Sequence, residues 1–275
     1  MLAQQSLRDG NLGEALAQLQ DQVRKAPAKA EYRTFLFQLL SVMGSWDRAL
    51  NQLSVVADLD DGTLAMVQTY REAIRCEVLR EEIFAGKRSP LLFGEPPEWV
   101  ALLIEALRLG AEGNHAESQA IRNQAFEAAP AISGTLDGQP FEWIADADPR
   151  LGPVLEAVVN GHYYWVPMQQ IRHINIEEPE DLRDLVWMPA YFTWANGGEA
   201  AGLIPTRYPG SFASQDPQIQ LSRKTEWIDA GSDLYLGLGQ RMLTTDGGEF
   251  PLMNIREINL DTVDEPAEPK PLDET

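Results

Sequence analysis

The sequence predicts a mixed α and β chain, in which tetratricopeptide-like helical hairpins precede a compact, mostly antiparallel and barrel-like β module. Three observations favour this fold class: a short repeat near the N-terminus, a run of turn-forming residues after Pro130, and aromatic and β-branched segments in the second half. The same observations place a helical domain at residues 1–130 and a Trp-rich α+β module at residues 131–260. Residues 261–275 are rich in acids and prolines, which predicts a disordered acidic tail.

The repeat defines the helical half. Residues 10–16 align without gaps with residues 44–50, and the offset of 34 residues is the tetratricopeptide period. In each copy a glycine stands at the turn, where a side chain would resist the backbone conformation. An alanine five positions later lets two helices approach closely, and the leucine beside it belongs to a buried stripe. A weaker copy begins at Gly113, so antiparallel helix pairs are expected throughout the first domain.

The second half has a different pattern. One further helix is predicted over residues 148–160, because Pro149 stands near its start and Gly161 at its end. Strands are predicted over residues 162–176 and 185–195, where aromatic and β-branched residues are frequent. Further strands, separated by glycine-containing turns, are expected up to residue 260, and together they predict the antiparallel β module.

Charge, cysteine content and hydropathy limit the classes of partner and the compartment that are expected. The formal net charge is −20, which repels nucleic-acid phosphates and anionic lipid headgroups. The single cysteine, Cys76, excludes an intramolecular disulfide. No apolar signal core is found in residues 1–20, and no apolar run is long enough to span a bilayer. We therefore expect a cytoplasmic protein that neither binds nucleic acid nor inserts into membranes.

The chain lacks recognisable catalytic signals. Its three histidines do not show zinc-binding spacing, and no nucleophile elbow or phosphate-binding loop is present. No catalytic residue, metal or cofactor is therefore expected. One alternative remains open, an enzyme whose site lies in the β module between Tyr163, Arg207 and Arg241.

Stacked helical hairpins form a curved groove that commonly accepts an extended peptide or an amphipathic helix. In the tetratricopeptide register, the residues predicted to face this groove are Gln38, Val42, Gln68, Arg75, Leu79, Leu103 and Leu107. This set is more apolar than cationic, which favours an amphipathic helix as the ligand. For Leu103 and Leu107, packing against neighbouring helices is an open alternative.

An ordered series of short motifs runs along the chain. They include residues 7–16, 141–146, 164–167 and 237–242, and the most specific of them occupy residues 186–190 and 204–211. In this series the chain resembles the ImpE family, also called TagJ, of type VI secretion accessory proteins, over nearly its whole length up to the acidic tail.

The resemblance implies a non-enzymatic cytoplasmic accessory of the contractile secretion apparatus. It further implies that the partner is the N-terminal helix of the small sheath subunit, and that the protein connects the sheath to the hexameric unfoldase that recycles it. The alternative is a general tetratricopeptide scaffold for chaperones or assembly factors, which would select an acidic C-terminal peptide.

Overall fold

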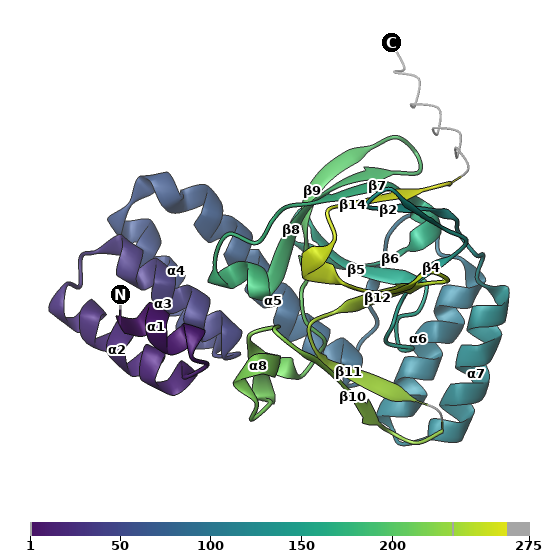
Figure 1. Cartoon of the computed structure of the whole chain (residues 1–275), viewed down its shortest axis with the longest axis horizontal. Coiled ribbons are helices and arrows are strands. Elements are labelled where there is room, and N and C mark those ends of the chain that lie inside the picture. Colours follow the sequence, from purple (N-terminus) through teal and green to yellow (C-terminus); the bar gives the residue numbers. More distant parts are fainter. Residues whose placement is uncertain (1, 233, 263–275) are drawn as a thin grey trace, which may run out of the picture.

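The computed structural model describes residues 2–232 and 234–262. Its helices lie on either side of a β-rich region (Figure 1). The α-helices of this part of the chain are α1 (Leu2–Arg8), α2 (Leu12–Lys25), α3 (Ala30–Val42), α4 (Trp46–Leu59), α5 (Leu64–Phe84), α6 (Glu98–Ala111), α7 (His115–Ala128) and α8 (Pro217–Gln220). The predicted acidic tail falls outside the described residues, apart from Asp261 and Thr262.

The helices pair in chain order. Contacts join α1 to α2, α3 to α4, and α6 to α7. Gly10, Gly44 and Gly113 stand at the turns between the paired helices with φ values of 78°, 65° and 87°. The pairs do not stack into one continuous array: Figure 1 shows α1 to α4 at one end of the molecule, α6 and α7 at the other end, and α5 between them. The tetratricopeptide likeness of the individual hairpins stays a prediction.

The strands form one large sheet and two small ones. Their bounds are β1 (Leu91–Leu92), β2 (Gly134–Leu136), β3 (Gln139–Phe141), β4 (Ile144–Asp146), β5 (Val154–Val159), β6 (His162–Pro167), β7 (Ile171–Ile176), β8 (Trp187–Trp194), β9 (Glu199–Pro205), β10 (Thr225–Asp229), β11 (Tyr235–Gly239), β12 (Met242–Thr245), β13 (Gly248–Pro251) and β14 (Glu257–Leu260). The nine-stranded sheet has the order β1-β6-β5-β9-β8-β7-β14-β2-β3, and the small sheets are β10-β11 and β13-β12-β4.

The sheet departs from the predicted barrel. All its strand pairs are antiparallel except β1 with β6, as the sequence indicates. However, the sheet has two free ends, at β1 and at β3, so it is open rather than a closed barrel. The helix predicted over residues 148–160 is also wrong, because this segment contains β5. Strand β5 lies between β6 and β9 and is buried at every position. A strand buried on both faces lacks the alternation of apolar and polar residues, so its periodicity does not distinguish it from a buried helix.

The hydrophobic core lies on both faces of the sheet. Alternate residues of β5 face opposite ways: Val154 and Val158 join the cluster shared with the helices, whereas Leu155 and Ala157 join the cluster on the other face. The first cluster runs from α1 and α2 through to buried residues of β8 and β9. The core is therefore continuous across residue 130, and the division of the chain at that point stays a prediction.

Gly44 allows the turn between α3 and α4 to pack closely against Phe212 of the β-rich half. Its φ is +65°, and an added Cβ would lie 2.3 Å from the ring of Phe212. Gly113 has φ +87°, but an added Cβ would meet no atom within 4 Å. Alanine at Gly113 therefore measures the backbone strain without a steric clash. We expect Gly44→Ala to lower the free energy of unfolding by about 2–4 kcal/mol and Gly113→Ala by about 1–2 kcal/mol. Urea unfolding of both variants checks this, and equal losses would contradict a tight contact at Gly44.

Candidate protein-binding surfaces

A buried network of charges joins α5 to the sheet. Arg80 on α5 donates to both carboxylate oxygens of Glu156 on β5, at 2.5 and 2.9 Å. Arg241 binds the same carboxylate and also that of Asp146, and the Tyr163 hydroxyl donates to Glu156 as well. All of these side chains are at most 3% exposed. Glu156 lies on the same face of β5 as Val154 and Val158, which explains why it meets the helix.

The network holds Glu156 in its ionised form. Burial alone would raise the pKa of this carboxyl, but the adjacent guanidinium groups of Arg80 and Arg241 outweigh burial and lower the pKa to about 2. Asp146 behaves differently: burial raises its pKa to about 6, even though Arg241 acts in the opposite direction. The junction is thus charged at neutral pH and sensitive to acid.

Glu156 should make the fold acid-labile. Its folded pKa of about 2 lies below the ordinary value of 4.5, so its contribution is full above pH 4.5 and lost as the pH falls toward 2. The shift corresponds to about 3 kcal/mol. Urea unfolding followed by tryptophan fluorescence should show this loss, and Glu156→Gln should show a much flatter dependence below pH 4.5. Parallel profiles for the two proteins would contradict this assignment.

Two arginines from the β-rich half bind the ends of N-terminal helices. Arg207 donates to the carbonyls of Ser41 and Val42 at the end of α3, at 2.9 and 2.7 Å, and to the Gln220 carbonyl at 2.8 Å. Arg223 donates to the carbonyls of Leu7 and Arg8 at the end of α1, both at 3.1 Å. The last carbonyls of a helix lack intrahelical partners and carry partial negative charge, so guanidinium groups stabilise them. These contacts hold the helices at the N-terminal end against the β-rich half.

The residues of the enzyme alternative belong to this junction. Tyr163, Arg207 and Arg241 are buried and hydrogen-bonded to protein groups. Arg80 and Glu156 belong to the same junction, although neither was among the site residues expected from the sequence. A signal was present for Glu156, since it is the one charge within the apolar run of residues 154–159. No comparable signal marked Arg80 on its helix.

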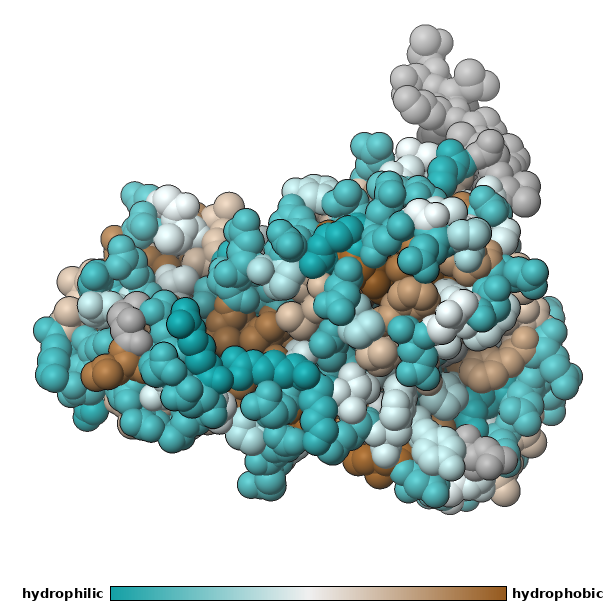
Figure 2. Space-filling model, viewed as in Figure 1, coloured by the Kyte–Doolittle hydropathy of each residue, from teal (hydrophilic) through white to brown (hydrophobic). Residues whose placement is uncertain are grey.

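An open hollow lies beside α3, and we call it the α3 groove. It has a volume of about 720 Å³ and lies between α1, α3 and the segment of residues 179–185. Its lining residues are Gln4, Ala30, Glu31, Thr34, Phe35, Gln38, Asp60, Thr63, Pro179, Glu180, Asp181, Leu182, Leu185 and Met253. Figure 2 shows apolar atoms in the hollow between the N-terminal helices and the β-rich half, with hydrophilic residues around them. The groove therefore combines apolar side chains with an acidic border.

A second hollow, the α5 cavity, has a volume of about 560 Å³. It lies between α5 and the neighbouring strands β8 and β9, and Gln68, Thr69 and Tyr191 are among its lining residues. Tyr191 is 55% exposed. This cavity is the second surface with room for a partner.

The predicted groove residues do not share one surface. Gln38 lines the α3 groove and Gln68 lines the α5 cavity. Val42, by contrast, is fully buried in the core, and the exposed Arg75 forms an ion pair with Glu72.

Leu79 is half-buried and packs against the core. Leu103 and Leu107 are buried, which agrees with the alternative that they pack against neighbouring helices. Both line a small cavity beside α7. The single groove was a wrong expectation, because α6 and α7 lie at the opposite end of the molecule from α3.

In residues 2–232 and 234–262, no group of three or more His, Cys, Asp or Glu side chains is arranged to hold a metal ion. Within the same ranges, no helix combines the length and the apolar character that crossing a membrane requires. Cys76 is a free, buried thiol whose pKa burial raises to about 12.

The molecule is thus an α+β protein in which buried arginines hold helices against an open antiparallel sheet. Residues 138–259 match the family model described as ImpE protein. A Pseudomonas aeruginosa protein named type VI secretion system accessory component TagJ is 52% identical over 264 residues, which cover 96% of this chain and 92% of that protein. The chain belongs to the ImpE family, and the resemblance inferred from its motifs is confirmed.

A solved structure shares the fold. The crystal structure of protein VPA1032 from Vibrio parahaemolyticus matches with a TM-score of 0.86 at 24% sequence identity. The match covers 94% of this chain and 97% of that one. The arrangement of helices and sheet is therefore that of a known architecture.

Proposed function

We propose that this protein is a non-enzymatic, cytoplasmic accessory of a bacterial type VI secretion system. It binds the N-terminal helix of the small contractile-sheath subunit and links the sheath to its recycling hexameric unfoldase. The observation that carries the proposal is the 52% identity, over 96% of the chain, to a relative named as an accessory component of that system. The burial of Tyr163, Arg207 and Arg241 supports a role other than catalysis.

The α3 groove is the surface that we propose for the sheath helix. Phe35, Leu182 and Leu185 are partly buried apolar residues that line the groove, and an apolar helix stripe would cover them. Glu180 and Asp181 also line it, so a partner helix with Lys or Arg beside its stripe is favoured. This acidic lining argues against the alternative scaffold, because an acidic peptide tail would be repelled.

Binding to purified partners tests the proposal. The full chain should retain the small sheath subunit in a pull-down, and deletion of the N-terminal helix from that subunit should abolish retention. Equal retention of the two forms would contradict the proposal. Retention of the unfoldase that depends on the sheath subunit, measured with all three proteins, would support the link between them.

A pair of threonine variants identifies the surface. Thr34 lies in the α3 groove and Thr69 lies in the α5 cavity, so Thr34→Arg and Thr69→Arg place the same bulky cation in each. We expect Thr34→Arg to weaken binding of the sheath subunit by about tenfold or more, which corresponds to 1.4 kcal/mol, and Thr69→Arg to leave it unchanged. Calorimetric titration measures both, with circular dichroism as the folding control. The reverse pattern would place the helix in the α5 cavity.

A further inference from the structure

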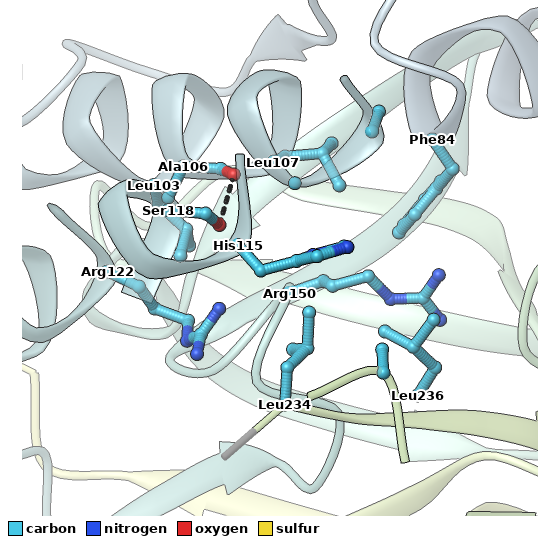
Figure 3. A pocket seen from close by; sticks show the side chains of 13 residues that line it. Phe84, Leu103, Ala106, Leu107, His115, Ser118, Arg122, Arg150, Leu234 and Leu236 are labelled. Atoms are coloured by element: carbon cyan, nitrogen blue, oxygen red, sulfur yellow. Dashed lines mark hydrogen bonds between the residues drawn. The ribbon is translucent and has the colours of Figure 1, made fainter. Parts of the chain in front are cut away.

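A small cavity lies at the end of the molecule opposite the α3 groove. It has a volume of about 100 Å³ and is bounded by α6, α7, the end of α5 and the hairpin of β10 and β11 (Figure 3). Its lining residues are Phe84, Leu103, Ala106, Leu107, Gly110, Ala111, His115, Ser118, Arg122, Arg150, Ala230, Leu234 and Leu236. Most of these are apolar, yet two are arginines.

Arg122 is the unusual member of this set. It is 5% exposed, and it makes no hydrogen bond or ion pair with any other residue in the described part of the chain. Buried guanidinium groups normally have a carboxylate or carbonyl partner, because removing an unpaired charge from water is costly. Figure 3 shows Arg122 and Arg150 on either side of the cavity, with His115 between them.

One carboxylate faces both arginines. The Asp148 side chain accepts from Arg150 Nε and a terminal nitrogen at 2.9 and 2.5 Å, and from the backbone N–H of Gly237 at 2.9 Å. Asp148 also attracts Arg122 electrostatically, but Arg150 occupies both of its oxygens. The buried Arg122 and the partly buried Arg150 thus share one anion, which leaves a local excess of positive charge in a chain whose formal net charge is −20.

A second unsatisfied group faces the same space. The Nδ1 atom of His115 is buried without a hydrogen-bond partner among the described residues. His115, Ser118 and Arg122 are three and four residues apart, so they share one face of α7. Ser118 already donates to the Ala106 carbonyl at 2.6 Å, which leaves His115 and Arg122 as the groups with unused hydrogen-bonding capacity.

We propose that this cavity is a binding site for a small carboxylate with a short apolar tail. The carboxylate accepts hydrogen bonds from the Arg122 guanidinium and from His115, and its charge completes the neutralisation that Asp148 begins. The tail packs against Phe84, Leu107 and Leu234. A water molecule needs roughly 10–15 Å³, so about 100 Å³ admits a chain of a few carbons and excludes a long one.

Pentanoate is the probe, and pentanamide is its neutral counterpart of matching shape. We expect millimolar or tighter binding of pentanoate to the full chain by calorimetry or ligand-observed NMR. Pentanamide should bind at least about tenfold more weakly, because the charge-assisted hydrogen bond is lost. Decanoate should not bind. Absence of pentanoate binding, or equal binding of acid and amide, would overturn the proposal.

Arg122→Met separates a ligand-binding role from a structural one. Removing an unpaired buried charge should raise the melting temperature by about 2–4 °C while abolishing pentanoate binding. Arg108→Met on α6 is the control, since the Arg108 side chain is 42% exposed and pairs with Glu105 and Glu112. It should leave pentanoate binding intact. A folded Arg122→Met protein that retains pentanoate affinity would overturn the proposal. The proposal would also be overturned if the protein bound the C-terminal carboxylate of a peptide but not pentanoate.

Discussion

Glu156→Ala should lower the free energy of unfolding by about 5 kcal/mol, the upper end of the range for breaking a buried ion pair. The substitution leaves Arg80 and Arg241 facing each other without the carboxylate that both contact. It also removes the acceptor of the Tyr163 hydroxyl. Urea unfolding monitored by the fluorescence of the buried tryptophans measures the loss.

The control for this variant is an exposed ion pair. Glu105→Ala removes the partner of Arg108 on the surface of α6, where solvent screens the interaction. Its unfolding midpoint should match that of the unmodified protein. If Glu156→Ala and Glu105→Ala behave alike, the buried network does not hold α5 to the sheet.

Arg207→Met is the second large effect, with an expected loss of about 3–5 kcal/mol. The variant leaves the carbonyls of Val42 and Gln220 without their donor, and each buried acceptor left unpaired costs about 1–3 kcal/mol. The Ser41 carbonyl loses Arg207 but keeps the backbone N–H of Gly44. Part of this cost is offset because the variant also avoids burying a charge. Burial lowers the pKa of Arg207 to about 10, so the side chain is still a cation at neutral pH.

Arg223→Met is the matched control. Arg223 makes the same kind of contact, with the last carbonyls of α1, but it is exposed and water can replace it. We expect a loss within about 1 kcal/mol. Hydrogen exchange adds a regional measurement: Arg207→Met should reduce protection in α3 more than in α6. Uniform loss of protection would contradict a local role at the junction with α3.

Local chemistry explains which elements could be predicted. The hairpin turns at Gly10 and Gly44 were found because a positive φ favours glycine wherever the rest of the chain lies. Strand β5 was mistaken for a helix because a strand buried on both faces lacks the alternation that identifies it. The barrel-like form of the predicted module is not confirmed, since whether two edge strands meet is not encoded in the pattern of either strand.

The sequence by itself determined the helix turns and the mostly antiparallel strands. It also determined the family, through a series of short motifs in a fixed order along the chain. Only the tertiary structure decided where α6 and α7 lie, and hence that Gln38 and Leu107 belong to different surfaces. It also decided the partners of Arg207 and the lack of one for Arg122 among the described residues. The physical reason is distance along the chain: a guanidinium that meets a carbonyl 166 residues away does so through the topology of the whole fold.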